Sequence, residues 1–194
     1  MLDHFAKHTK HQIGGQGKAM LVTRSRLHVV KFKREFDRQL RERDDIDTRC
    51  IGAFSGVVEE DGVKYRESNL NDFPPREIKS NFDTDEYRIL IVASKFQTGF
   101  DQPLLETMWV DKSLSGVNAV QTLSRLNRTH PGKDSVSVID FINDPGKIQE
   151  SFQPYYETKI LTEETDPNVL YDFEHEILQK GLIDRKDVED FMNA

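Results

Sequence analysis

The sequence predicts an α/β fold in which helices cover both faces of a parallel β-sheet. Two observations support this prediction. Short apolar runs recur along the chain, and segments with helical character separate most of them by short connections. Strand, helix and strand in alternation are typical of a parallel sheet that is buried on both sides. Ligands of such sheets bind outside the carboxyl ends of the strands, so we expect functional residues at those ends.

The predicted strands are near-continuous apolar runs, as expected for strands without a solvent-facing side. The first ends at a threonine and the second at a Ser-Gly turn, while the third is the most strand-like segment of the chain. They are KAMLVT (18–23), RCIGAFSG (49–56), YRILIVAS (87–94), ETMWVD (106–111) and DSVSVIDFI (134–142).

Three helices are predicted between these strands. The first follows Ser25, a suitable N-cap, and its apolar residues recur at helical spacing as Val29, Phe32, Phe36 and Leu40. The other two are PREIKSNF (75–82) and GVNAVQTLSRLNR (116–128). Residues 57–75 are polar and contain Gly62 and two prolines, which predicts a long surface loop.

Composition divides the chain into three parts. Residues 1–17 are expected to form a lead-in helix or linker, 18–143 the α/β domain, and 144–194 a helical extension. The extension is acidic, with thirteen acidic and five basic residues. The segment 18–43 is basic instead, with nine basic and three acidic residues. That local charge is compatible with nucleic-acid binding and equally with an ordinary solvated helix face.

The composition also bounds the location of the protein. At 36% hydrophobic and 31% charged residues, the chain can form a core beneath a very polar surface. Cys50 is the one cysteine, which excludes an internal disulfide and favours a reducing compartment. Apolar runs are too short to span a bilayer, and the N-terminus lacks the apolar centre of a signal peptide. We therefore expect a cytoplasmic protein without a membrane partner.

Three patterns suggest catalytic or metal sites but lack residues that such sites need. GGQGKAM (14–20) lacks the spacing of a phosphate-binding P-loop, has Ala19 where that loop needs a hydroxyl, and precedes a strand. Three histidines at helical spacing near the N-terminus, and two aspartates at the end of the last strand, could each begin a metal site. The residues concerned are His4, His8, His11, Asp140 and Asp144. Neither group has the further ligands that a metal site needs, so no metal site is expected.

The segment SKFQTGFDQP (94–103) indicates a ligand-binding turn. Gly99 allows close approach of the backbone, and the carboxylate of Asp101 can accept hydrogen bonds from ribose hydroxyls. A tight turn without a ligand explains the same string equally well when it is taken alone. Thr98 adds a hydroxyl to this turn.

A family resemblance links these segments. QTLSRLNR (121–128) resembles the last conserved motif of superfamily 2 helicases, with Gln121, Arg125 and Arg128 in place, although Ser124 stands where the motif has glycine. TGFD resembles the motif that precedes it, and MLVTRS and IGAFSG resemble the two motifs that open the second RecA-like domain. The longer string 89–133 resembles the motor subunit of type I restriction enzymes in particular.

The resemblance implies a RecA-like domain that contributes half of an ATP site. ATP and Mg²⁺ would be cofactors of the full-length enzyme and would not be bound by this segment alone. The first RecA-like domain would supply the phosphate loop and the magnesium ligands. Arg125 and Arg128 would neutralise charge on the transferring γ-phosphate, with Gly99, Asp101 and Gln121 as nucleotide contacts. The alternative is that the arginines form salt bridges to Asp101 or Asp111.

The resemblance also implies translocation along double-stranded DNA, within a complex that includes modification and specificity subunits. Five residues would lie near the phosphate backbone, where contacts suit a motor that moves on any sequence: Thr23, Arg24, Ser25, Ser55 and Thr98. The endonuclease activity would belong to another domain of the subunit. Two other functions stay open, a complete ATPase of unknown type and a non-catalytic helicase-fold domain that docks on a partner protein.

Overall fold

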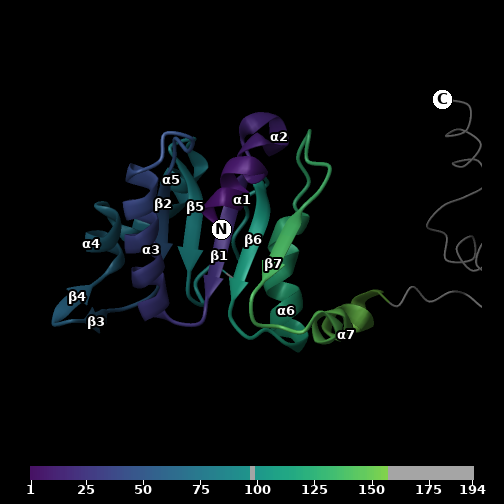
Figure 1. Ribbon diagram of the computed structural model, residues 1–194. Coiled ribbons are helices and arrows are strands. Elements are labelled where there is room, and N and C mark those ends of the chain that lie inside the picture. The colour runs from purple at the N-terminus through teal and green to yellow at the C-terminus, as the bar shows by residue number, and fades with distance from the viewer. Residues whose placement is uncertain (97–98, 157–194) are drawn as a thin grey trace, which may run out of the picture. The chain divides into compact units, whose positions relative to one another are not determined.

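The computed structural model describes residues 1–96 and 99–156. A five-stranded parallel sheet lies at their centre, in the order β2-β5-β1-β6-β7, with all arrowheads at the same edge (Figure 1). The strands are β1 (Lys18–Thr23), β2 (Arg49–Ala53), β5 (Tyr87–Val92), β6 (Leu105–Asp111) and β7 (Ser137–Asp140). All five predicted strands therefore occur, and the predicted α/β class is confirmed.

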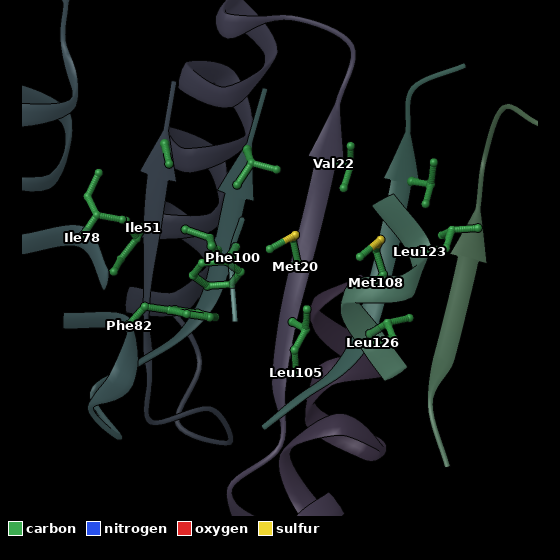
Figure 2. Close-up of a cluster of buried hydrophobic side chains, with 14 of the residues drawn as sticks. Met20, Val22, Ile51, Ile78, Phe82, Phe100, Leu105, Met108, Leu123 and Leu126 are labelled. Atoms are coloured by element: carbon green, nitrogen blue, oxygen red, sulfur yellow. The ribbon is translucent and has the colours of Figure 1, made fainter. Parts of the chain in front are cut away.

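Helices cover both faces of this sheet. α1 (Leu2–Lys7) and α3 (Arg26–Arg41) pack on one apolar layer, and Trp109 lies in that layer, edge-on to Phe36. α5 (Ile78–Asp83) and α6 (Gly116–Leu123) pack on the other layer, which Figure 2 shows around Met20 and Met108. This two-sided burial explains why the strands read as continuous apolar runs, and it gives the expected RecA-like sandwich.

The helix termini follow local sequence signals. Ser25 is the N-cap of α3, as predicted, and its hydroxyl accepts a hydrogen bond from the His28 amide at 3.3 Å. The predicted helix 116–128 is α6 followed by a 3₁₀ turn, η3 (Ser124–Asn127), and the predicted helix 75–82 begins as the 3₁₀ turn η2 (Pro75–Glu77). α7 (Pro145–Tyr156) begins the predicted helical extension, whose residues 157–194 lie outside the described residues.

Residues 1–17 pack on the sheet. They form α1, the 3₁₀ turn η1 (Thr9–His11) and α2 (Gln12–Gly15), and Phe5 is buried in the core. Arg88 of β5 holds the segment: its Nη2 donates to the carbonyl oxygens of Lys10 at 3.0 Å and Gly17 at 2.7 Å. Its guanidinium also lies 5.3 Å from the centre of the Phe5 ring.

The prediction of a long surface loop over 57–75 was wrong. This region forms the hairpin β3 (Val58–Glu60) and β4 (Val63–Tyr65), followed by α4 (Glu67–Asn71). α4 is fixed by buried polar bonds, since Asn71 accepts from the Gly52 amide at 2.8 Å and donates to the Gly52 carbonyl at 2.7 Å. These bonds satisfy the backbone of β2, the strand at one edge of the sheet. Buried polar side chains thus fix α4 on the sheet, whereas apolar side chains hold the other helices in place.

No helix in the described ranges, 1–96 and 99–156, is long and apolar enough to cross a bilayer.

Lys18, at the start of β1, carries a fully buried ammonium group. Its Nζ donates to the carbonyl oxygens of Phe82 at 2.7 Å, Thr84 at 2.6 Å and Tyr87 at 3.1 Å, which joins β1 to the segment between α5 and β5. Burial lowers the pKa of Lys18 to about 8, because loss of water disfavours the charged form more than the nearby Asp85 favours it.

We therefore expect the stability of the protein to rise with pH between about 8 and about 10, relative to a Lys18→Met variant. An unfolded lysine has a pKa of about 10.4, so the unfolded chain binds more protons in this interval and the free energy of unfolding increases. The relative gain approaches about 3 kcal/mol. Urea unfolding of both proteins at neutral and at alkaline pH measures it.

The Lys18→Met variant also controls for the titration of Cys50. Burial raises the pKa of this thiol, so its ionisation lowers the free energy of unfolding as the pH rises, and it does so in both proteins. An identical pH dependence of the two free energies would contradict the assignment to Lys18.

Candidate functional site

The segment that contains Gly99 and Asp101 runs along one face of the sheet. Phe100 is buried in the layer beneath α5 and α6, where Figure 2 shows it near Phe82. Only four residues later, the carbonyl oxygen of Leu104 accepts from the amide of Lys18 at 2.8 Å, at the amino end of the sheet. Asp101 therefore lies toward the amino end. Asp101 is thus separate from the residues at the carboxyl ends of the strands.

Arg125 joins the end of α6 to this segment. It lies in η3, and its Nη1 donates to the carbonyl oxygen of Phe100 at 3.0 Å. Its Nε also donates to the carbonyl oxygen of Gln121 at 3.3 Å, one helical turn earlier. The guanidinium is half-buried, so these backbone bonds orient it at the rim of the core.

Arg128 lies just beyond η3, where the backbone becomes extended. Its Nε is 3.0 Å from Oδ1 of Asp101, and the two side chains are 48% and 72% exposed. Of the predicted nucleotide residues, the structure thus brings Arg125, Arg128 and Asp101 together. Gly99 is exposed in the same segment with a φ of 65°, and the exposed Gln121 lies one turn before Arg125 on α6.

Ser124, the departure from the helicase motif, does not distort the helix. Its φ of −63° is right-handed, so this position does not need the conformational freedom of glycine. Its hydroxyl donates to the carbonyl oxygen of Gln121 at 3.3 Å. The hydroxymethyl group is therefore bonded back to its own helix.

The predicted DNA residues lie at the opposite, carboxyl end of the sheet. Arg24 is exposed and bonds to Asp111 at the end of β6, which raises the pKa of its guanidinium. Ser25 is half-buried as the cap of α3, and Ser55 is exposed after β2. Thr23 is buried, and its hydroxyl donates to two backbone carbonyl oxygens, of Ser25 and Val92, each at 3.0 Å.

Thr98 lies outside the described residues. Of the predicted DNA residues that the structure describes, Arg24, Ser25 and Ser55 have available side chains, whereas Thr23 fixes the backbone between β1 and α3.

Two cations at this edge were missed by sequence reasoning. Arg26 Nη1 donates to the carbonyl oxygen of Ser55 at 3.2 Å, which joins the start of α3 to the loop after β2. Lys95 forms a two-point ion pair with the buried carboxylate of Glu67, at 2.7 and 2.8 Å, and that carboxylate also accepts from the Phe54 amide. Arg26 directly follows the predicted N-cap, Ser25, and could have been included among the predicted DNA residues. Lys95 was harder to predict, because its partner Glu67 lies in the segment that was predicted to be a loop.

The two groups of residues suit anionic ligands. Both present guanidinium donors, and the group at the carboxyl end adds the hydroxyls of Ser25 and Ser55; donors of these kinds bind phosphate oxygens. Over residues 1–96 and 99–156, no cluster of three or more His, Cys, Asp or Glu side chains could hold a metal ion. His4 contacts Thr9 through Nδ1 at 3.4 Å, and its ring lies 5.0 Å from that of His8.

Comparison with known proteins finds similarity to type I restriction enzymes over part of the chain. The sequence profile described as "Type I restriction enzyme subunit R domain 3" matches residues 62–143. The MjaVIIP endonuclease subunit of Methanocaldococcus jannaschii, itself only provisionally assigned to a type I restriction enzyme, is 33% identical over 138 residues. The type I restriction enzyme HindI endonuclease subunit of Haemophilus influenzae is 30% identical over 74 residues.

These relatives are much longer than the aligned region. The alignment with the archaeal subunit covers 64% of this chain and 13% of the relative, and the alignment with HindI covers 37% and 7%. Among solved structures, the C-terminal part of the Fun30 ATPase domain superposes with a TM-score of 0.46 and 14% identity, over 77% of this chain and 44% of that one. The profile and the relatives agree that part of this chain is similar to type I restriction enzyme R subunits.

Proposed function

We propose that this chain is the second RecA-like domain of a type I restriction motor subunit, in which it completes an ATP site and contacts double-stranded DNA during translocation. The observation that carries the proposal is the grouping of Arg125, Arg128 and Asp101 at the end of α6. Similarity to the R-subunit family supports it.

Arg128 is suited to bind a phosphate that arrives from outside this domain. Its present partner, Asp101, is exposed, and an exposed ion pair contributes only about 0–1 kcal/mol. A phosphate group with several acceptor oxygens can therefore replace that carboxylate at little cost, particularly through the paired donors of a guanidinium. The salt bridge to Asp101, the alternative weighed for this arginine, would then be its partner in the nucleotide-free state.

Arg125 would act beside it from a more fixed position. Its bonds to the carbonyl oxygens of Phe100 and Gln121 hold the plane of the guanidinium group. Phosphoryl transfer spreads negative charge over three oxygens, and a guanidinium already in place stabilises that charge without reorganisation.

The donors of this group fit the phosphate end of ATP rather than its metal. Magnesium prefers carboxylate and water oxygens, and the part of the chain that the structure describes has no cluster of candidate metal ligands. ATP and Mg²⁺ would therefore be held largely by another RecA-like domain. We expect no ATP turnover by this chain alone.

The carboxyl edge would contact the DNA backbone. Arg24, Ser25, Arg26 and Ser55 follow the ends of β1 and β2, are exposed or half-buried, and offer hydrogen-bond donors for phosphate oxygens. Contacts with phosphate position a protein on a duplex without reading its sequence. Modification and specificity subunits would supply the recognition of the target site. A non-catalytic docking domain would explain the same fold, and the arginine variants below decide between the two.

In the complete subunit, we expect Arg128→Ala to lower kcat for DNA-dependent ATP hydrolysis by roughly 10³- to 10⁵-fold. KM for ATP should change much less, because the contact strengthens in the transition state. Arg125→Ala should lower kcat similarly and also reduce the melting temperature, since it loses the bond to Phe100. Lysine should restore little activity at either position.

Arg49→Ala is the matched control, because Arg49 is 55% exposed and also has one carboxylate partner, Glu86, at 2.9 Å. Normal turnover of a folded Arg128→Ala variant would contradict the catalytic role and favour a docking function.

For DNA, we expect weak, sequence-independent binding whose affinity falls steeply with salt, by a log–log slope of about −0.9 per phosphate contacted. Arg24→Ala should reduce the magnitude of that slope by about one. Arg49→Ala again serves as the control, since the side chain of Arg49 is as exposed as that of Arg24 (55% and 53%) but Arg49 begins β2, at the amino end of the sheet. Titration of a fluorescent duplex at several salt concentrations measures the slope. Equal slopes for the two variants would place the DNA elsewhere.

A further inference from the structure

The chain reverses direction immediately after Arg128. The amide of Lys133 donates to the carbonyl oxygen of His130 at 3.0 Å, and Pro131 and Gly132 occupy the central positions of this turn. Gly132 has a φ of 79°, a value that glycine adopts without strain and that a type II turn requires at its third position. The sequence HPGK thus returns Lys133 toward the residues that it has just left.

Lys133 uses its ammonium group to join two segments. Its Nζ donates to the carbonyl oxygens of Leu126 at 2.6 Å and Arg128 at 2.9 Å, at the end of η3. It also donates to the carbonyl oxygen of Pro103 at 3.1 Å, in the segment that carries Asp101. An ammonium has three hydrogens, so this geometry uses its full donor capacity.

This position has a clear physical reason. The last carbonyl groups of a helix lack intrahelical partners and carry the negative end of the helix dipole, so a cation is stabilising there. Burial lowers the pKa of Lys133, although the buried carboxylate of Glu106 acts in the opposite direction. The Lys133 side chain is half-buried. Bonds from a charged donor are stronger than neutral ones, so the three contacts restrain both segments.

We propose that Lys133 is a positioning residue for Arg128. It fixes the backbone of Arg128 relative to the segment 99–103, so that the guanidinium can exchange Asp101 for a phosphate without a change in the backbone. Lys133 touches neither nucleotide nor metal in this role and acts through Arg128. The inference rests on the proposed role of Arg128 in ATP hydrolysis.

The test uses Lys133→Met in the complete subunit, a change that keeps the apolar stem and removes the ammonium. We expect kcat for ATP hydrolysis to fall by about 10- to 100-fold, because a small displacement of a catalytic group has an effect of that order. KM for ATP should stay within about threefold. Lys133→Arg, which keeps the charge and can still donate to the carbonyls, should recover most of the rate.

Lys10→Met is the control, since Lys10 Nζ donates to a single backbone carbonyl oxygen, that of Asp45, at 2.6 Å, and lies in the N-terminal segment. It should leave kcat unchanged. If Lys133→Met does not fold, Lys133→Gln, which can still donate two hydrogen bonds, replaces it and should give a smaller loss.

A second measurement does not depend on ATP hydrolysis. Hydrogen–deuterium exchange of the same subunits should be several-fold faster in peptides that cover 99–105 and 126–130 when Lys133 is methionine, and unchanged with Lys10→Met. Unchanged exchange in those peptides overturns the inference. So does normal kcat for a folded Lys133→Met variant when Arg128→Ala is inactive, and the proposed function then stands. If Arg128→Ala is itself fully active, the proposed function fails, and the exchange measurement alone decides whether Lys133 restrains Arg128.

Discussion

The hydrogen bond from Arg125 to the carbonyl oxygen of Phe100 connects the two segments on which the proposed ATP site depends. A guanidinium cannot enter an apolar core without a large loss of hydration, yet a catalytic one must be held still. The chain meets both requirements at the rim of the core. Phe100 is buried and anchors the segment from below, while its carbonyl oxygen fixes the arginine above. The same two segments carry Arg128 and Asp101, which form an ion pair with each other.

The fold separates this group from the predicted DNA residues. Arg24, Ser25 and Ser55 lie where β1 and β2 end, whereas Arg125 and Arg128 lie toward the amino end of the sheet. α6 starts after the carboxyl end of β6 and ends in η3 beside the arginines, so one packed element extends between the two ends (Figure 1). A rigid domain with separate contacts at its two ends is compatible with a motor that links a nucleotide site to a DNA site, as proposed here.

The parts of the fold that follow from apolar patterning were predictable. The strand 18–23 has the predicted bounds, and Ser25 caps α3 as expected, because both depend on local sequence. The segment 57–75 was misread because its structure depends on buried polar bonds from Glu67 and Asn71, which no periodicity reveals. The residues of the proposed site can be named from sequence motifs, whereas their arrangement in space cannot. Asp101 lies away from the carboxyl ends of the strands, because the chain returns to the amino end of the sheet before β6 begins. Lys133 reaches its partners because the chain turns back after the motif 121–128.

The most direct measurement of the central claim is a structure of the complete subunit with ADP, magnesium and aluminium fluoride, which mimics the transferring phosphate. We expect guanidinium nitrogens of Arg125 and Arg128 within about 3.2 Å of the fluoride or bridging atoms, a distance typical of hydrogen bonds. We also expect that Arg128 has left Asp101, its partner at 3.0 Å in the present structure. A fluoride group neutralised by other residues, with the Arg128–Asp101 pair intact, would contradict the proposed role of the two arginines.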